Sequence, residues 1–442
     1  MFNPSLYKNK KCLIIGGGKS GISCAKLLSQ KLKAEIIISD RQKIKSKFNC
    51  VTESNAINKI DEIDFAIKSP GVSNNNPLIK ALKARKIKIF SEVEVAIAFS
   101  KTENIVMITG TNGKSTTTYL TYKIFDDYLR KSGKKAILCG NIGDPVSKEI
   151  LKAKKDDWLI IEISSYQIED STYLKPKVAA ILNITPDHID HHGSFKKYIK
   201  AKFKIFSNMD KNSFLIINGD DKILKTIKKI KPKILKFSIR NQLSDIYIKK
   251  QKIFLKKDKK SFTPSNIPGE HNLLNQMAAI LIASTFNIPA KSIQKTLDSF
   301  KGLEHRIEFV REFRGVKYIN DSKGTNVDST LIALKAIGKA KNIWLIMGGV
   351  HKNSPYSPLI PYIKKYVKKI LTIGEAAPII EKELGKYCEI INTCNIKNAV
   401  KATRSAQKGD IVLLSPACAS FDQFKNFEDR GKKFKALVRR LK

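Results

Sequence analysis

The stretch Thr109-Gly110-Thr111-Asn112-Gly113-Lys114-Ser115-Thr116 decides the fold class of this chain of 442 residues. It follows a short apolar run at 105–108 and precedes a segment typical of a helix, which is the strand–loop–helix order of phosphate-binding loops. The standard pattern G-x-x-x-x-G-K-[ST] requires glycine at position 108, where this chain has Ile108. The loop is therefore a variant in which Gly110 and Gly113 shape a shorter cradle.

Phosphate chemistry explains the residue types in this loop. Successive backbone N–H groups hold the β- and γ-phosphates of a nucleoside triphosphate, and the ammonium group of Lys114 neutralises their charge. The hydroxyl group of Ser115 or Thr116 is the expected protein ligand of a Mg²⁺ ion. We therefore expect an ATP site at this loop.

Short apolar runs alternate with longer, lysine-rich amphipathic segments along the chain, which predicts an α/β protein. The runs that we expect to form strands are Cys12–Ile15, Ile36–Ser39, Ile105–Thr109, Trp158–Ile163, Val178–Ile184, Ile343–Met347 and Ile411–Leu414. We predict three domains, at residues 1–94, 95–302 and 303–442. The stretch 222–262 carries no motif, and we expect it to form peripheral strands and turns.

A second glycine loop lies near the start of the sequence. Residues Gly16–Gly21 fit the pattern G-x-G-x-x-G between an apolar run and a helix-like segment, and Asp40 ends the next predicted strand. This is the fingerprint of a dinucleotide site, so a nicotinamide-dependent dehydrogenase is one interpretation, although the motif suits any nucleotide diphosphate. The turn Ser69-Pro70-Gly71 follows another strand of this block and is expected to line the same crevice.

Polar residues also end two strands of the central block. Glu162 follows the run 158–161, and Asn183 to Asp190, which includes His188, follows the run that starts at residue 178. A carboxylate at the carboxyl end of a strand beside a phosphate loop is well placed for Mg²⁺. His191 and His192 adjoin this segment, and the alternative interpretation is that they are solvated loop residues.

The net charge of +42 is unusual, because 82 Lys and Arg residues stand against 40 Asp and Glu residues. Such a charge suggests an ATPase that binds nucleic acid. The alternative is a compositional bias, since lysine, isoleucine and asparagine are abundant here and have AT-rich codons. We favour the bias and expect no nucleic-acid partner.

The composition and the apolar pattern exclude several classes of protein. Hydrophobic residues make up 42% of the chain, which excludes a mostly disordered protein. The N-terminal apolar run is too short for a signal-peptide core, and no segment has the roughly 20 mainly apolar residues of a membrane span. The seven cysteines form no C-x-x-C pair, which fits a reducing compartment. We expect a cytoplasmic protein with no membrane insertion.

Further motifs follow the phosphate loop in a fixed order: Asn141-Ile142-Gly143, Glu162–Gln167, His271-Asn272, Gly302–Arg306, Asn320–Asn326 and Leu414–Phe427. With these motifs the chain resembles the Mur ligase superfamily, and most closely its branch that adds D-glutamate to UDP-N-acetylmuramoyl-L-alanine. The Asp-Asn-Pro-Arg motif of the branch that adds diaminopimelate or lysine is absent from the sequence, which argues against that sister ligase. The resemblance implies a Rossmann-like UDP-binding domain, a central P-loop ATPase-type mixed α/β domain and a C-terminal Rossmann-like α/β domain.

The resemblance also assigns residues to binding sites. The UDP substrate is assigned to Lys19, Ser20, Asp40, Arg41, Ser69, Pro70, Gly71, Asn141, Ser164, Gln167 and His188. ATP is assigned to Gly110, Thr111, Asn112, Gly113, Lys114, Ser115, Thr116, Asn272, Asn275, Arg306 and Asp321. D-Glutamate is assigned to Lys323, Thr325, Lys352, Ser420 and Phe427.

The implied catalytic residues are Lys114, Glu162, His188 and Lys202. Two Mg²⁺ ions are implied, with Ser115, Glu162, His188 and Lys202 as ligands. Lys202 aligns with a lysine that relatives carbamylate, and only a modified, anionic side chain would bind a cation, because a free lysine has a pKa near 10.4.

The implied reaction has two steps, because a carboxylate does not form an amide directly. The alanine carboxylate takes the γ-phosphoryl group of ATP, and the neutral amine of D-glutamate then displaces phosphate from the acyl phosphate. Asp187 or His188 is the candidate base for that amine. We expect one chain to act as a monomer on ATP, D-glutamate and UDP-N-acetylmuramoyl-L-alanine.

Overall fold

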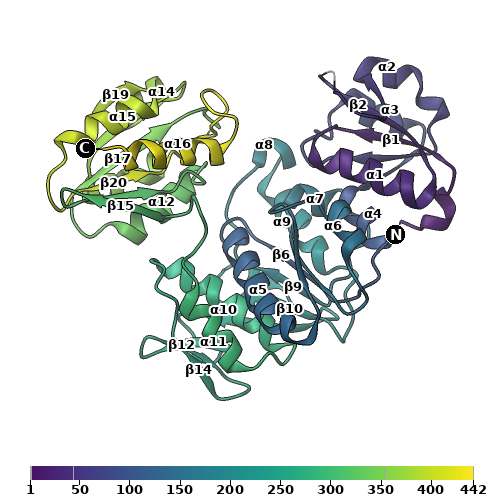
Figure 1. The fold of residues 1–442 in the computed structure, drawn as a ribbon, viewed down its shortest axis with the longest axis horizontal. Coiled ribbons are helices and arrows are strands. Elements are labelled where there is room, and N and C mark those ends of the chain that lie inside the picture. The colour runs from purple at the N-terminus through teal and green to yellow at the C-terminus, as the bar shows by residue number, and fades with distance from the viewer. Residues whose placement is uncertain (1, 43, 353, 442) are drawn as a thin grey trace. The chain divides into compact units, whose positions relative to one another are not determined.

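The computed structural model describes residues 2–42, 44–352 and 354–441, and it contains three β-sheets that follow one another along the chain (Figure 1). Most strands are parallel, and their residues are mainly buried Ile, Val, Leu and Ala. Parallel strands that are covered on both faces read as continuous apolar runs, which is the pattern that the sequence shows.

The first sheet has five parallel strands in the order β3-β2-β1-β4-β5. Its strands are β1 (Lys11–Ile15), β2 (Glu35–Asp40), β3 (Asn49–Thr52), β4 (Phe65–Lys68) and β5 (Lys88–Ser91). The helices of this block are α1 (Lys19–Leu32), α2 (Glu53–Asn58), α3 (Pro77–Ala84) and α4 (Glu92–Ala98). The strand order reverses between β1 and β4, and ligands of such sheets bind at the carboxyl ends of the strands at this point.

The central sheet has nine strands in the order β14-β13-β12-β11-β10-β9-β6-β8-β7. Its strands are β6 (Ile105–Thr109), β7 (Ala136–Gly140), β8 (Trp158–Glu162), β9 (Val178–Ile181), β10 (Phe214–Asn218), β11 (Lys233–Ser238), β12 (Ile246–Lys249), β13 (Lys252–Leu255) and β14 (Lys260–Phe262). The helices are α5 (Lys114–Leu129), α6 (Val146–Glu149), α7 (Ser165–Glu169), α8 (Ile189–His192), α9 (Phe195–Phe203), α10 (Glu270–Ser284) and α11 (Ala290–Ser299). Strands β12–β14 form an antiparallel edge at one end of an otherwise parallel sheet.

The third sheet has six strands in the order β15-β16-β20-β17-β18-β19, and only β15 is antiparallel to its neighbour. Its strands are β15 (Glu308–Phe313), β16 (Val316–Asn320), β17 (Ile343–Gly348), β18 (Val367–Ile373), β19 (Glu389–Cys394) and β20 (Ile411–Leu414). The helices are α12 (Val327–Ile337), α13 (Ile360–Tyr366), α14 (Ala377–Leu384), α15 (Ile396–Ala402) and α16 (Phe427–Arg439).

Alternate residues of the central strands build separate cores on the two faces of a sheet. In β17, Ile343, Leu345 and Met347 belong to one hydrophobic cluster, whereas Trp344 and Ile346 belong to another. Successive side chains of a strand point to opposite faces, so an apolar strand of this kind supports a helical layer on each side.

The chain divides into two compact units, residues 1–265 with 274–299 and residues 266–273 with 300–442. The first two sheets therefore belong to one unit. The predicted boundary at residue 94 lies inside α4, and both 94/95 and 302/303 remain predictions of domain limits.

Buried polar contacts around α4 join the first two sheets into that unit. The Glu94 carboxylate accepts hydrogen bonds from the backbone N–H groups of Phe2 at 3.1 Å and Thr172 at 2.7 Å. Lys68, at the end of β4, is 2% exposed and pairs with Asp170 at 2.6 Å. Burial raises the pKa of Asp170, and the charge of Lys68 opposes this shift. Each buried charge in these contacts thus has a partner.

The α/β class predicted from the sequence is confirmed, and every predicted strand is present. The predicted limits differ from the observed ones by one residue at several strands, and most at β9, which ends at Ile181 rather than at residue 184. The backbone leaves the ladder there because the carbonyl and side chain of Asn183 bond to the phosphate loop instead. The stretch 222–262 forms strands β11–β14 and turns, as expected.

Among the described residues, no helix combines the length and apolarity that crossing a membrane requires.

Loss of the buried pair should destabilise the first unit. We expect Lys68→Met to lower the free energy of unfolding by about 3–5 kcal/mol, because the Asp170 carboxylate stays buried without a counter-ion. Replacing both partners, as Lys68→Met with Asp170→Leu, should recover most of that loss. Urea unfolding followed by tryptophan fluorescence, in a Trp344→Phe background that leaves Trp158 of the first unit as the probe, measures the change.

The matched control is the exposed pair of Lys10 and Asp64, whose side chains are 50% and 36% exposed. Lys10→Met should change the free energy of unfolding by no more than about 1 kcal/mol. Equal effects of Lys10→Met and Lys68→Met would contradict a special role for the buried pair.

Candidate active site

The phosphate loop turns sharply between β6 and α5 because two glycines take backbone conformations that other residues avoid. Gly110 has φ +159° and Gly113 has φ +83°. A Cβ atom on Gly113 would lie 2.3 Å from the side-chain oxygen of Asn275, so this position has no space for a side chain. The N-terminus of α5 at Lys114 thus stands at the end of β6, where its backbone N–H groups attract phosphate.

A side chain from the neighbouring strand end holds this loop in place. The Asn183 amide oxygen accepts a hydrogen bond from the Asn112 backbone N–H at 2.8 Å, and its amide nitrogen donates to the Asn112 carbonyl at 3.0 Å. The Thr111 hydroxyl contacts Tyr198 OH at 2.9 Å and donates to the Thr185 carbonyl. The site prediction from sequence did not include Asn183, although its place after a predicted strand beside the loop was a usable signal.

Two lysine side chains meet at one backbone oxygen of the loop. Lys114 Nζ donates to the Gly110 carbonyl at 2.9 Å and to the Thr111 carbonyl at 2.8 Å. Lys202 Nζ, from α9, donates to the same Gly110 carbonyl at 2.9 Å. Burial and then repulsion by Lys114 hold the pKa of Lys202 well below the ordinary value of a lysine. Lys202 is therefore a buried amine that gives up its proton readily.

The Glu162 carboxylate fits a magnesium ion. It is buried at the end of β8, and its Oε1 atom accepts a hydrogen bond from the Asn141 side chain at 2.7 Å. Within the described residues, Glu162 Oε2 and Thr116 Oγ1 are buried oxygen atoms without a hydrogen-bond partner. Mg²⁺ prefers such hard oxygen ligands, so both atoms suit it. Asn141, predicted as a substrate contact, orients this carboxylate.

A first cavity of about 380 Å³ lies at the switch point of the first sheet. It is lined by seven of the predicted UDP-substrate residues: Lys19, Ser20, Asp40, Arg41, Ser69, Pro70 and Gly71. Asp40 also accepts a hydrogen bond from the Gly17 backbone N–H at 2.8 Å, so this carboxylate holds the glycine loop. The structure thus brings together residues from the ends of β1, β2 and β4.

A second cavity of about 550 Å³ shares Pro70 and Gly71 with the first. Its other lining residues are Ser73, Lys114, Asn141, Ser164, Ser165, Tyr166, His188, His191, Tyr198 and Lys202. The cavity at the switch point of the first sheet and the cavity at the phosphate loop are therefore adjacent.

Two predicted substrate residues of this region differ in their placement. His188 lines the second cavity, has φ +53°, and its Nδ1 atom lies 2.9 Å from Tyr166 OH. Gln167 is buried and does not line the cavity, because its side-chain oxygen accepts hydrogen bonds from the Ser164 N–H and hydroxyl groups. This reciprocal capping box starts α7, so Gln167 acts on Ser164 rather than facing the cavity.

Predicted nucleotide contacts of the second compact unit surround a buried carboxylate. Asp321 follows β16 and accepts hydrogen bonds from the Ser415 hydroxyl at 2.7 Å and the Ile307 N–H at 3.2 Å. Burial raises the pKa of Asp321 to about 6, against the lowering effects of Arg306 and Ser415.

Within the described part of this unit, His271 Nε2 and Arg306 Nε are buried without a hydrogen-bond partner, which suits an incoming polar ligand. Asn272 follows His271 in the sequence and donates to the Pro268 carbonyl.

The predicted D-glutamate residues lie on the loops that follow β16, β17 and β20 in the same unit, except Phe427, which is the first residue of α16. These residues are Lys323, Thr325, Lys352, Ser420 and Phe427, and the Lys323 ammonium lies 5.4 Å from the centre of the Phe427 ring. Val350 and Ala419 exchange two backbone hydrogen bonds, which joins two of the loops.

A fully buried arginine fixes all three loops. Arg430 on α16 donates to the Ser322 hydroxyl at 3.0 Å, the Ser322 carbonyl at 2.9 Å and the Cys418 carbonyl at 3.2 Å. Its fourth hydrogen bond goes to the Gly348 carbonyl at 3.4 Å, so Arg430 contacts one residue from each loop or strand end. Arg430 carries no local sequence signal, because its role depends on carbonyl groups that only folding brings together.

Three family models match successive parts of the chain. They are described as Mur ligase MurD-like, N-terminal domain, at residues 10–91, Mur ligase middle domain, at 108–283, and Mur ligase, glutamate ligase domain, at 305–418.

Curated relatives match along the whole chain. The UDP-N-acetylmuramoylalanine–D-glutamate ligase of Elusimicrobium minutum is 44% identical over 455 residues, which cover 100% of both chains. The enzyme of the same name from Clostridioides difficile is 41% identical over 456 residues, covering 98% of this chain and 99% of the relative.

Solved structures share the fold at low sequence identity. The UDP-N-acetylmuramate-alanine ligase MurC from Thermotoga maritima has a TM-score of 0.63 and 16% identity, over 97% of this chain and 99% of that one. The MurF ligase from Thermotoga maritima in complex with ADP has a TM-score of 0.61 and 16% identity, and the match covers 99% of this chain and 97% of that one.

The geometry of Gly113 makes a prediction about nucleotide binding. We expect Gly113→Ala to weaken ATP binding more than about tenfold. A left-handed backbone conformation costs an alanine ~1–2 kcal/mol, and the displacement of Asn275 by the new Cβ atom adds to that cost. Isothermal titration with ATP measures the change.

Gly133 is the matched control, since it has φ +70° but no atom within 4 Å of an added Cβ. Gly133→Ala should bind ATP like the unmodified protein. Unchanged ATP binding by Gly113→Ala would show that the tight contact does not shape the site.

Proposed function

This chain belongs to the Mur ligase family, and on that premise we propose that it joins D-glutamate to UDP-N-acetylmuramoyl-L-alanine with hydrolysis of ATP, in peptidoglycan synthesis. The observation that carries the proposal is the pair of cavities that share Pro70 and Gly71 and end at Lys114. Relatives that carry the name of this ligase and match the whole chain support the choice of D-glutamate.

The substrate is proposed to extend along both cavities. The uridine diphosphate occupies the first cavity at the end of β1, where the N-terminus of α1 attracts its phosphates. The N-acetylmuramoyl-alanine part continues past Pro70 and Gly71 into the second cavity. Its carboxylate then reaches the phosphate loop, where Lys114 offsets the negative charge.

The proposed reaction passes through an acyl phosphate. An oxygen of the alanine carboxylate attacks the γ-phosphorus of ATP, the bond from that phosphorus to the bridging oxygen breaks, and ADP leaves. The neutral amine of D-glutamate then attacks the acyl carbon, loses a proton to a base such as Asp187 or His188, and inorganic phosphate leaves. Both transfers bring anions together, so the cationic groups at the loop lower their barriers.

Magnesium is proposed at two positions of this site. Glu162 with Ser115 or Thr116 would hold one ion, and His188 with a carbamylated Lys202 would hold the other. When bound, Mg²⁺ supplies positive charge to the phosphate oxygens.

Lys202 is proposed to be carbamylated because its environment favours the reactive form of the amine. The neutral nitrogen attacks the carbon of CO₂, a proton leaves the nitrogen, and the product is an anionic carbamate. Burial, which lowers the pKa of Lys202, favours that neutral amine. The carbamate would also remove the repulsion between Lys202 and Lys114.

The amino acid is proposed to bind to the loops that Arg430 holds together. Lys323 and Lys352 provide positive charge for the two carboxylates of D-glutamate, and the Ser420 hydroxyl donates a charge-assisted hydrogen bond. Thr325 and Phe427 complete this pocket.

The setting of the enzyme is part of the proposal. We expect it to work in the cytoplasm, where ATP is available, as a monomer, since all assigned site residues come from one chain. The positive charge then serves to attract anionic substrates, without a nucleic-acid partner.

An amino-acid screen tests the proposed function. With UDP-N-acetylmuramoyl-L-alanine and ATP present, we expect ADP release with D-glutamate, and none above background with L-glutamate, L-alanine, diaminopimelate or L-lysine. Release that depends on one of the other amino acids would assign the chain to a sister ligase. Lys114→Ala should reduce the D-glutamate-dependent rate at least about 100-fold. The control Lys123→Ala removes a lysine from the same helix, whose partner is Asp127, and should keep the rate.

A separate experiment tests the modification of Lys202. Protein equilibrated with ¹³C-bicarbonate should show one carbamate resonance in its ¹³C spectrum, and Lys202→Arg should lack that resonance because arginine does not form a carbamate under these conditions. Lys114→Arg serves as the control and should retain the resonance. An unchanged spectrum for Lys202→Arg would assign the signal to another amine.

A further inference from the structure

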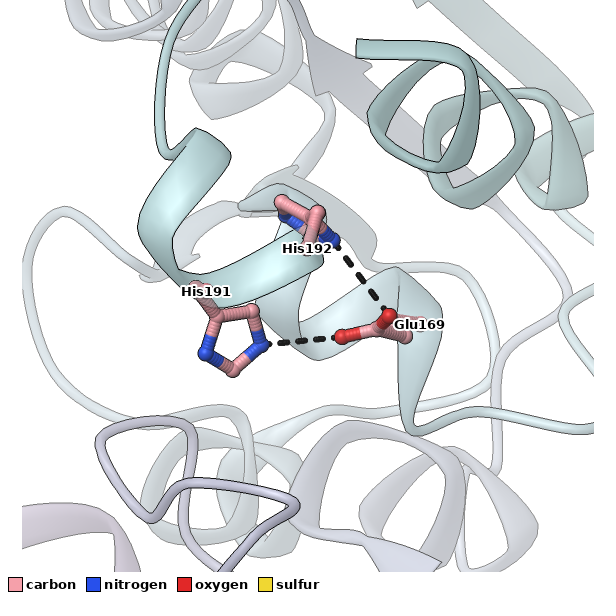
Figure 2. Close-up of side chains that lie close together, drawn as sticks. All are labelled: Glu169, His191 and His192. Carbon is pink, nitrogen blue, oxygen red and sulfur yellow. Dashed lines mark hydrogen bonds and ion pairs between the residues drawn. The ribbon is translucent and has the colours of Figure 1, made fainter. Parts of the chain in front are cut away.

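Two histidines and a glutamate converge beside the second cavity. Figure 2 shows the imidazole rings of His191 and His192, both from α8, directed toward the carboxylate of Glu169 at the end of α7. His191 Nε2 lies 2.9 Å from Glu169 Oε2, and His192 Nδ1 lies 3.3 Å from Glu169 Oε1 (Figure 2). The interpretation of these histidines as solvated loop residues is wrong, since their side chains are 9% and 0% exposed.

The spacing of the three ligand atoms matches a small divalent transition-metal ion. One nitrogen from each ring and one carboxylate oxygen all lie within 4.8 Å of one another. A tetrahedral Zn²⁺ ion with ligand distances of about 2.0–2.2 Å holds its ligand atoms about 3.3–3.6 Å apart. Small side-chain shifts would therefore bring the three atoms to coordinating distance.

The environment of His192 resembles that of a metal ligand. The Nε2 atom, on the far side of the ring from Glu169, lies 3.0 Å from the Ser165 hydroxyl. A histidine that binds a metal through one nitrogen usually donates its other N–H to such a partner, which fixes the ring. The buried ring thus has one nitrogen for an ion and one for an orienting hydrogen bond.

In the described part of the chain, the Glu169 carboxylate is not neutralised by a lysine or arginine side chain, so it is available to bind a metal cation. Burial raises the pKa of Glu169, but the hydrogen bonds from His192 and His191 outweigh it and lower the pKa to about 2. In the described part of the chain, these two imidazoles are the ion-pair partners of the carboxylate. Its other polar neighbour is the Asn74 amide at 3.5 Å, while Lys204 donates to the Glu169 backbone carbonyl instead.

A second cluster of one histidine and two glutamates has a lysine as its counter-ion. Glu304, His305 and Glu308 also cluster, but the Lys435 ammonium lies 2.8 Å from Glu308 and contacts Glu304. A protein cation already neutralises these carboxylates, so this group serves as a comparison.

We propose that Glu169, His191 and His192 form a binding site for Zn²⁺ or a related divalent transition-metal ion. Imidazole nitrogens favour such ions, whereas the oxygen ligands near the phosphate loop favour Mg²⁺. His191 lines the second cavity, which provides an entry path and an oxygen ligand from water for the fourth position. The ion cross-links α7 to α8 and stiffens the wall of the cavity that contains Tyr166 and His188.

Binding displaces protons in a defined way. His191 Nε2 and His192 Nδ1 must each be deprotonated to coordinate, so any proton shared with Glu169 leaves to solvent. His192 then keeps its proton on Nε2 and donates it to Ser165. Metal affinity should therefore rise with pH.

Titration of the full chain with Co²⁺ tests the proposal, because Co²⁺ absorbs visible light when nitrogen ligands bind it and is displaced by Zn²⁺. We expect one equivalent of bound Co²⁺ and competition by Zn²⁺. Glu169→Gln and His191→Ala should each weaken binding by at least about 10–100-fold. Zn²⁺ should raise the melting temperature of the unmodified chain but not that of these variants.

Two further variants locate the ion. Glu162→Gln removes a carboxylate of the proposed magnesium position and Glu308→Gln one of the comparison group, and both should bind Co²⁺ like the unmodified chain. Circular dichroism of each variant, together with ATP titration of the variants outside the proposed magnesium position, confirms that the chain is folded. Unchanged Co²⁺ affinity in Glu169→Gln and His191→Ala, or loss only in Glu162→Gln or Glu308→Gln, overturns the proposal.

Discussion

The carbonyl oxygen of Gly110 is the point on which the catalytic region depends, because Lys114 and Lys202 both donate hydrogen bonds to it. Two ammonium groups at one buried oxygen repel each other, and burial adds a further cost to each charge. In the proposed function, phosphate groups beside Lys114 and a carbamate on Lys202 would offset these charges. The same loop needs glycine at Gly113, which has φ +83° and against which Asn275 packs.

A common rule of parallel sheets explains the position of the candidate substrate and nucleotide residues at strand ends. In each of the three sheets, the polar residues follow the carboxyl ends of neighbouring strands: β1 and β4, then β6 and β8, then β16, β17 and β20. The central part of each strand is buried on both faces and has no room for such groups. In the first unit, Pro70 and Gly71 line both cavities and so link two of these strand ends.

The parts of the site that could be predicted from sequence are those with local patterns. The phosphate loop, the glycine loop and Glu162 stand next to apolar runs, so their position at strand ends followed from the order of residues. Supporting residues had no local pattern. Asn183 and Arg430 act on backbone carbonyl and N–H groups far away in the sequence, and Gln167 was assigned to the substrate although it caps α7.

The sequence by itself determined the α/β class, the order of the three sheets and the family, because these depend on apolar periodicity and on contiguous motifs. Only the tertiary structure decided that the first two sheets form one compact unit, that Lys202 is a buried amine, and that Glu169 meets His191 and His192. Each of these depends on burial and on distances between residues remote in sequence. Such quantities arise from packing and are not encoded in any single stretch of residues.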